Sequence, residues 1–136
     1  PDYYARRPKK CMGGWGRRLV VVAPDGLVLP CHAARDLPGL AFWNARERSL
    51  AECWNDAPGM NAYRDEAWMR EPCRSCVKRS EDFGGCRCQA FRLTGDATNT
   101  DPACALAPQR ASLLDARARA APTAWIARGV GAQEGN

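Results

Sequence analysis

Hydrophobic and polar positions predict their clearest element in the first quarter of the chain. Two runs rich in Val and Leu, 19–22 and 27–29, flank the sequence Ala-Pro-Asp-Gly at 23–26. Pro and Asp favour a turn, and Gly26 can adopt a positive φ. The pattern therefore predicts a β-hairpin.

This hairpin is expected to bring two cysteines toward each other. If Val22 pairs with Leu27, Cys31 lies opposite Arg18 at the open end of the hairpin. A glycine-rich stretch precedes the first strand and can fold Cys11 back toward the same end. We therefore expect Cys11 and Cys31 to meet.

A capping box predicts the first helix. Ser49 and Glu52 have the required spacing, in which the Ser hydroxyl accepts from the third amide and the Glu carboxylate reaches back to the Ser amide. A short helix from Leu50 to Asp56 should follow, and Pro58 should end it.

Two further helices are expected. Met60, Tyr63 and Ala67 mark the apolar side of an amphipathic helix that Pro72 closes. The Ala-rich and Arg-rich end of the chain predicts a weak helix from Gln109 to Ala121.

The composition indicates that an apolar core is not the main source of stability for this fold. Leu, Val, Ile and Phe together supply 20 of 136 residues, about 15% and below the roughly 20% that marks an ordinary packed domain. Eight Cys and five Trp argue against simple disorder, so covalent or metal cross-links should replace the missing apolar volume. Residues 73–104 are dominated by Cys, Gly and charge, and we expect bound metal to fix their loops.

Charge and the start of the chain narrow the functional class. The net charge is +5, and basic residues gather on both sides of the first Cys. Solvation or compensation of an anionic metal group explains them better than nucleic-acid binding, because no nucleic-acid-binding motif accompanies them. No stretch approaches about 18 consecutive apolar residues, so no membrane span is predicted. The chain lacks an initial Met and a signal-peptide pattern, which suggests a piece of a longer polypeptide in a reducing compartment, the cytoplasm.

Seven of the eight cysteines are distributed like metal ligands. Cys73 and Cys76 form a CxxC pair, whose two-residue spacer directs both sulfurs to one site. Five more lie in loops or at strand ends: Cys11, Cys31, Cys86, Cys88 and Cys104. In a reducing compartment, such thiols favour metal ligation over disulfides. Cys53 instead falls on the buried side of the first predicted helix, where a Cys packs as a small hydrophobe.

Seven thiols are one short of two four-ligand sites. His32 and Asp82 are the nearest other candidates, and His32 is more simply explained as a loop residue or a donor behind the ligands. Iron–sulfur ligation uses all seven thiols if Asp82 joins them. Zinc is the rival, and one tetrahedral zinc site would use Cys73, Cys76, Cys86 and Cys88. Spacing alone does not decide between the two.

The order of these residues is similar to that of a known domain. The series Cys11, Gly26-x4-Cys31, Cys73-x2-Cys76-x5-Asp82-x3-Cys86 and Cys104 resembles the SPASM domain, the C-terminal extension of radical SAM enzymes that modify peptides. The stretches Cys11-Met-Gly-Gly-Trp-Gly-Arg and Gly84-Gly-Cys-Arg-Cys-Gln-Ala resemble the branch that acts in pyrroloquinoline quinone (PQQ) biosynthesis. The resemblance implies a small α+β domain over residues 1–108, with a β-hairpin, short helices and long metal-organised loops. An Ala/Arg-rich tail, weakly helical or disordered, follows over 109–136.

The resemblance also implies the ligands of two auxiliary iron–sulfur clusters. A distal 4Fe–4S cluster would be held by Cys73, Cys76, Asp82 and Cys104, where most relatives carry Cys in place of Asp82. A second cluster nearer the radical site, 2Fe–2S or 4Fe–4S, would be held by Cys11, Cys31, Cys86 and Cys88. Candidate donors to cluster sulfur are the amides of Gly13, Gly14, Gly84 and Gly85. Candidate counter-charges are Arg17, Arg18, Arg74 and Arg87.

An activity and partners follow from the same resemblance. A complete enzyme of this branch cleaves S-adenosylmethionine at a third 4Fe–4S cluster and cross-links a Glu to a Tyr in the peptide PqqA, which the chaperone PqqD presents. A flavodoxin-type protein would supply electrons. The CxxxCxxC motif of the third cluster does not occur in this sequence, so we expect no catalytic residue and no S-adenosylmethionine site here. The expected role is electron transfer and scaffolding, with a zinc-stabilised binding module as the alternative.

Overall fold

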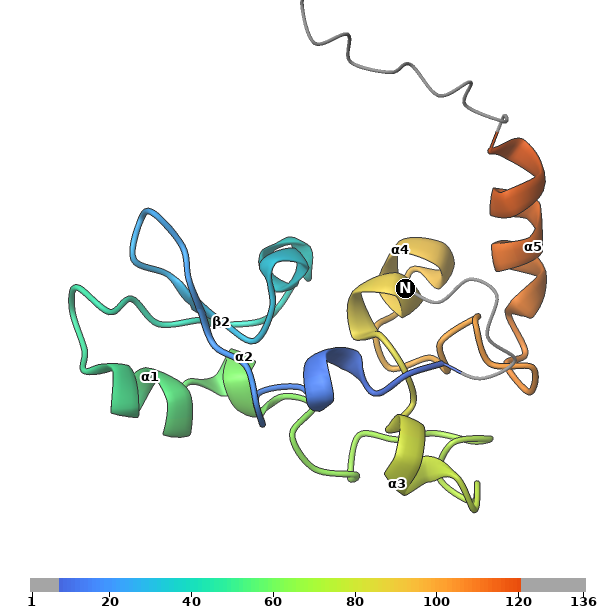
Figure 1. Ribbon diagram of the computed structural model, residues 1–136, viewed down its shortest axis with the longest axis horizontal. Coiled ribbons are helices and arrows are strands. Elements are labelled where there is room, and N and C mark those ends of the chain that lie inside the picture. Colours follow the sequence, from blue (N-terminus) through green and yellow to red (C-terminus); the bar gives the residue numbers. More distant parts are fainter. Residues whose placement is uncertain (1–7, 121–136) are drawn as a thin grey trace, which may run out of the picture.

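The computed structural model describes residues 8–120 (Figure 1). Its elements in chain order are η1 (Cys11–Gly13), β1 (Val21–Val22), β2 (Val28–Leu29), η2 (His32–Asp36), α1 (Leu50–Asn55), α2 (Pro58–Asn61), α3 (Arg79–Asp82), α4 (Arg87–Thr94) and α5 (Arg110–Arg119). One antiparallel hairpin with several short helices gives the predicted α+β class. The hairpin, α1 and α2 lie at one end in Figure 1, and α3, α4 and α5 at the other. Within this described part, no helix is long and apolar enough to cross a membrane.

The hairpin forms where the Val and Leu runs predicted it, but its register is shifted. Val22 pairs with Val28 and not with Leu27. The Leu27 amide donates to the Asp25 carboxylate at 3.3 Å, and this local bond lengthens the turn by one residue. The shift also changes the predicted position of Cys31 across the hairpin.

Helix α1 begins as predicted. The Ser49 hydroxyl accepts from the Glu52 amide at 3.2 Å, and the Glu52 carboxylate accepts from the Ser49 amide at 2.9 Å. The helix ends at Asn55, one residue before the predicted end, and its Cys53 is fully buried as expected.

The second predicted helix is wrong beyond its first turn. Pro58 begins α2 instead of only ending α1, because Pro suits the first position of a helix. The Asp65 carboxylate then accepts from the Ala67 amide at 2.9 Å, a local turn that competes with helical bonding. The chain bends so that Tyr63 and Trp68 pack edge to face, with ring centroids 5.3 Å apart.

Residues 73–104 contain more regular structure than predicted, because α3 and α4 both lie in this segment. Helix α4 buries Arg87, Cys88 and Ala90, a short face that the surrounding charges and glycines conceal in the sequence. Helix α5 agrees with the helix predicted from Gln109, with Ala120 as its C-cap. The rest of the predicted tail, 121–136, lies outside the described residues.

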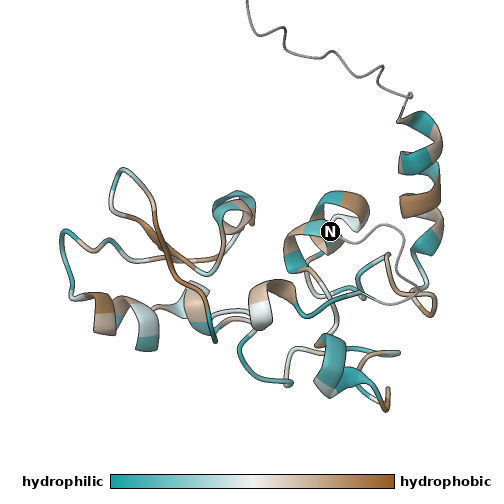
Figure 2. Cartoon of the chain, in the orientation of Figure 1, coloured by the Kyte–Doolittle hydropathy of each residue, from teal (hydrophilic) through white to brown (hydrophobic). Residues whose placement is uncertain are grey.

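Two apolar clusters form the interior. The larger contains the buried residues Trp15, Leu29, Cys31, Ala34, Leu37, Tyr63, Cys88 and Ala97. The smaller contains Met69, Cys73 and Phe83. Trp68 packs against both clusters. Figure 2 shows hydrophobic colour along the hairpin and hydrophilic colour on α3, so the two halves of the chain have unequal apolar support.

Candidate metal centre

Four cysteines from three distant segments of the chain meet in one place. The Sγ atoms of Cys11 and Cys86 are 3.9 Å apart, and those of Cys31 and Cys88 are 3.8 Å apart. Cys31 also affects the pKa of Cys11, and Cys86 affects that of Cys88, and all four cysteines line one pocket. We call these four cysteines the thiol ring. All eight cysteines of the chain are free thiols.

Three elements deliver the members of the thiol ring. Cys11 opens η1, and Cys31 follows β2 as the N-cap of η2. Cys86 is the N-cap of α4, and Cys88 lies in the first turn of that helix. Because Cys31 and Cys88 belong to the larger apolar cluster, core packing helps to hold the ring. The predicted meeting of Cys11 and Cys31 is confirmed despite the shifted hairpin register.

Hydrogen bonds divide the four sulfurs into two kinds. Interactions with Cys11 and Cys88 lower the pKa of Cys31 and of Cys86. The same interactions, with burial, raise the pKa of Cys11 and of Cys88. The thiolate, which a lowered pKa favours, is the form of Cys that binds metals.

Asp101 holds the α4 side of the thiol ring. Its buried carboxylate accepts from the Cys86 amide at 2.7 Å, the Gln89 side chain at 2.6 Å and the Ala103 amide at 2.9 Å. Gly85 has a φ of +80°, and a Cβ there would lie 2.5 Å from the Cβ of Asp101. A side chain at Gly85 would therefore displace the group that fixes Cys86.

Sequence reasoning assigned no role to Asp101. Its only signal is the Asp-Pro dipeptide at 101–102, which favours a turn. A turn signal does not reveal that the carboxylate reaches an amide 15 residues earlier in the chain.

The thiol ring opens into a pocket of about 680 Å³. Besides the four ring cysteines, its lining includes Lys9, Lys10, His32, Gln89 and Asp101. His32 is exposed at the start of η2, directly after Cys31 in the chain. The pocket gives the ring sulfurs an open approach from one side.

The donors in the thiol ring fit a metal–thiolate centre. Four Cys sulfurs are common ligands of zinc sites and of iron–sulfur clusters. A tetrahedron with metal–sulfur distances of about 2.3 Å has sulfur–sulfur edges of about 3.8 Å, close to the sulfur–sulfur distances of 3.9 and 3.8 Å in the thiol ring. Among residues 8–120, however, no three His, Cys, Asp or Glu side chains are positioned to hold a single ion. Binding would therefore require the ring sulfurs to turn from one another toward a common centre.

The other predicted ligand set, which we call the distal set, consists of Cys73, Cys76, Asp82 and Cys104. Cys73 Sγ lies 3.2 Å from the hydroxyl of Thr100. Burial raises the pKa of Cys73, and the charges of Asp82 and Cys104 add to this shift, so these three side chains share one neighbourhood. The Cys76 amide donates to the Cys73 carbonyl at 3.2 Å, as the turn of a CxxC pair requires.

Two expected arrangements differ from the structure. The four glycine amides proposed as donors to sulfur donate to oxygen instead; the acceptors are the carbonyls of Lys10, Cys11 and Asp82 and the Asp82 carboxylate. The zinc alternative grouped Cys86 and Cys88 with the CxxC pair, but both contact the cysteines of the hairpin side. The helical start of α4 at Cys86, which the sequence did not reveal, directs them there.

One of the four candidate counter-charges is buried. Arg87 is only 1% exposed. Its Nη1 donates to the carbonyls of Ala97 and Asn99 at 2.8 and 2.9 Å, and its Nη2 donates to the carbonyl of Gly84. The guanidinium carbon lies 4.3 Å from the ring centroid of Trp68. The other three candidates are exposed: Arg17, Arg18 and Arg74.

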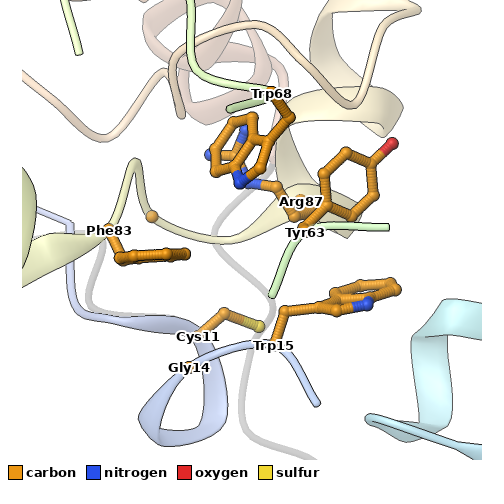
Figure 3. A pocket seen from close by; sticks show the side chains of 8 residues that line it. Cys11, Gly14, Trp15, Tyr63, Trp68, Phe83 and Arg87 are labelled. Atoms are coloured by element: carbon orange, nitrogen blue, oxygen red, sulfur yellow. The ribbon is translucent and has the colours of Figure 1, made fainter. Parts of the chain in front are cut away.

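A narrow aromatic gap lies beside the thiol ring. Figure 3 shows Cys11 at this gap, with the side chains of Trp15, Tyr63, Trp68, Phe83 and Arg87 around it. The aromatic rings form a chain of edge-to-face contacts. The ring centroids are 5.1 Å apart for Trp15 and Tyr63, 5.3 Å for Tyr63 and Trp68, and 6.3 Å for Trp68 and Phe83. The gap has no room for a water molecule, so charges that border it are weakly screened.

Comparison with protein families identifies the domain. Residues 11–77 match the SPASM model, described as an iron–sulfur cluster-binding domain. The SPASM match is confined to residues 11–77. The matched residues include two members of the thiol ring, Cys11 and Cys31, and the CxxC pair of the distal set.

Curated relatives match the SPASM domain and the residues that follow it. The PqqA peptide cyclase of Methylorubrum extorquens (strain PA1) is 57% identical over 134 residues, which cover 96% of this chain and 35% of the relative. The PqqA peptide cyclase of Methylobacterium sp. (strain 4-46) is 61% identical over 113 residues, 83% of this chain and 30% of the relative. That of Granulibacter bethesdensis is 62% identical over 108 residues, 79% of this chain and 29% of the relative. The chain spans about a third of the length of these relatives.

Proposed function

We propose that this chain is the auxiliary iron–sulfur part of a radical SAM enzyme that cross-links Glu to Tyr in the peptide PqqA during PQQ biosynthesis. The observation that carries the proposal is the thiol ring, because its four sulfurs come from three distant segments and form two close pairs in one pocket. The similarity to iron–sulfur cluster-binding domains and to PqqA peptide cyclases supports the same function.

In this proposal each ligand set holds one cluster. The thiol ring binds a 2Fe–2S or 4Fe–4S cluster through Cys11, Cys31, Cys86 and Cys88. The distal set binds a 4Fe–4S cluster through Cys73, Cys76, Asp82 and Cys104. Asp82 supplies a harder oxygen ligand than thiolate, and ligand identity is one of the features that set a cluster's potential.

The chain's own residues bind, orient and shield these groups. Joining Glu to Tyr removes hydrogen from an aromatic ring and so requires an electron acceptor; a bound iron–sulfur cluster supplies one-electron chemistry of this kind. Asp101 fixes the Cys86 amide, and the apolar cluster around Cys31 and Cys88 excludes water from one side of the ring. No residue of this chain is proposed to bind S-adenosylmethionine or to abstract hydrogen.

The proposed partners belong to the longer protein of which this chain covers about a third. They are the substrate peptide PqqA, the chaperone PqqD and a flavodoxin-type reductant, in the cytoplasm. The net charge of +5 is assigned to solvation and to compensation of anionic clusters, and neither nucleic acid nor membrane is proposed as a partner.

A zinc-stabilised module is the second candidate function. The sulfur contacts of 3.8 and 3.9 Å are close to the edge of a tetrahedral zinc–thiolate site, about 3.8 Å. A zinc site would stabilise the fold without electron transfer, because zinc has no redox chemistry in proteins. It would leave the protein colourless.

Metal and acid-labile sulfide analysis of anaerobically prepared protein tests the proposal. The unaltered chain should be brown and contain iron and sulfide, and Cys31→Ala should lose the iron of the thiol ring. Cys53→Ala is the matched control, because Cys53 is also buried, more deeply than Cys31, but belongs to neither ligand set. A colourless protein with stoichiometric zinc would replace this proposal by the zinc module. Equal iron loss in both variants would overturn the ligand assignment.

A further inference from the structure

Arg87 is the one buried cation among the described residues. Burying a charge is costly unless partners compensate it. Three backbone carbonyls accept from its Nη atoms, but carbonyls solvate a cation without cancelling its charge. Its Nε has no hydrogen-bond partner in the described part of the chain.

The acidic neighbours of Arg87 belong to both ligand sets. The groups that interact with its charge are Asp101, Cys73, Cys86 and Cys11. Cys86 and Cys11 are members of the thiol ring, and Cys73 belongs to the distal set. Asp101 in turn accepts from the Cys86 amide. One guanidinium thus interacts electrostatically with sulfur ligands of both sets, and it lines the same gap as Cys11.

The surroundings of Arg87 favour strong charge interactions. Its guanidinium stacks over Trp68, which packs against both apolar clusters. Arg87 also lines the water-free gap that Cys11 borders (Figure 3). Interactions between charges across such a gap are weakened less than those at the surface.

We propose that Arg87 is the shared counter-charge of the two ligand sets, raising the reduction potential of both bound clusters at once. This inference rests on the proposed iron–sulfur function. Reduction adds a negative charge to a cluster, and a nearby buried cation stabilises the reduced form. Loss of the cation leaves Asp101 as an uncompensated negative charge beside the thiol ring, which lowers the potential further.

Redox titration of the cluster-loaded protein, followed by electron paramagnetic resonance, tests this proposal. Arg87→Gln should shift both auxiliary potentials to more negative values, each by at least a tenfold change in the oxidised-to-reduced ratio, equivalent to 59 mV for one electron. Arg87→Lys keeps the charge and should shift both potentials less. Arg74→Gln is the matched control. Arg74 directly follows a ligand cysteine, Cys73, as Arg87 follows Cys86, but its side chain is exposed. This variant should leave both reduction potentials unchanged.

Iron content is measured first and separates the outcomes. If Arg87→Gln holds iron and neither potential moves, or only one moves, the shared counter-charge is overturned. If Arg87→Gln loses its iron, Arg87→Lys decides: iron retained with near-normal potentials supports the proposal, whereas equal loss assigns Arg87 to loop structure alone and overturns it. An iron-free unaltered chain would contradict the proposed function itself.

Discussion

The thiol ring and the distal set are prepared by the polypeptide in different ways. The ring sulfurs already contact one another, because Cys31 and Cys88 are fixed in the larger apolar cluster and Asp101 anchors Cys86. In the distal set, Cys73 faces a hydroxyl instead of a second thiol. Its apolar support is a cluster of three buried residues.

This difference separates two sources of order in one small domain. Ordinary packing and hydrogen bonds bring the ring sulfurs together. Three side chains of the distal set share one neighbourhood with less apolar packing around them, so we expect metal binding to contribute more to the order of this set. Such coupling of binding to folding is common where a preformed site is incomplete.

Metal removal is expected to produce the largest contrast between the two sets. Chelation should leave amides near Val28 and Cys88 protected, since the larger apolar cluster persists. Amides of residues 73–82 should exchange roughly a hundredfold faster, because few apolar contacts hold their turns. Hydrogen exchange followed by mass spectrometry measures both segments in one sample. Equal loss of protection would show that the ring also depends on metal.

Substitution of Asp82 should affect only the distal set. Asp82→Ala should remove about half of the iron if the thiol ring holds a 4Fe–4S cluster and about two thirds if it holds a 2Fe–2S cluster, because the distal 4Fe–4S cluster loses a ligand. Glu81→Ala is the control: it removes the adjacent, exposed carboxylate, which pairs with Lys78 at 2.5 Å. Iron analysis of both variants, with the absorption spectrum of what remains, measures the effect. Unchanged iron in Asp82→Ala would remove the oxygen ligand from the account.

Substitution of Asp101 should weaken the thiol ring through its anchor. Asp101→Ala leaves three donors without their buried acceptor and should cost about 3 kcal/mol of unfolding free energy. Asp36→Ala, which removes an exposed ion pair with Arg92, should cost less than about 1 kcal/mol. Urea unfolding compares the two. Similar small losses would mean that Asp101 does not hold the Cys86 side.

The smallest expected effect concerns the hairpin that carries Cys31. Arg35 donates to both Asp25 oxygens at 2.9 and 2.8 Å, which lowers the pKa of Asp25 from 3.8 to about 2. The folded pKa lies below the unfolded one, so the stabilisation is present above pH 3.8 and is lost as the pH falls toward 2. Asp25→Asn should therefore be slightly less stable at pH 6 and equal to the unaltered chain near pH 2. If the stability difference between Asp25→Asn and the unaltered chain grew as the pH fell, the predicted direction of the pH dependence would be contradicted.

Much of the hairpin half was predictable because its signals are local. The Pro-Asp-Gly turn, the capping box at Ser49 and the buried position of Cys53 each depend on a few adjacent residues. The register was wrong because the Asp25 side chain takes the Leu27 amide. The second helix was wrong because Asp65 forms a competing turn.

In the candidate site, too, the residues with local sequence signals were predictable and those that depend on distant partners were not. The set of cysteines could be read from their spacing and from resemblance, and the meeting of Cys11 with Cys31 followed from a hairpin and a glycine-rich loop. The roles of Asp101 and Arg87 could not be read. Each depends on α4, which the sequence concealed, and on partners 10 to 15 residues away.

The most direct test of the central claim isolates the thiol ring. A chain in which Cys73, Cys76 and Cys104 are all replaced by Ser keeps Cys11, Cys31, Cys86 and Cys88 and should be prepared anaerobically with iron and sulfide. Iron, acid-labile sulfide and the visible spectrum are then measured per chain. The account predicts a coloured protein that retains one iron–sulfur cluster. A colourless protein without sulfide would contradict it.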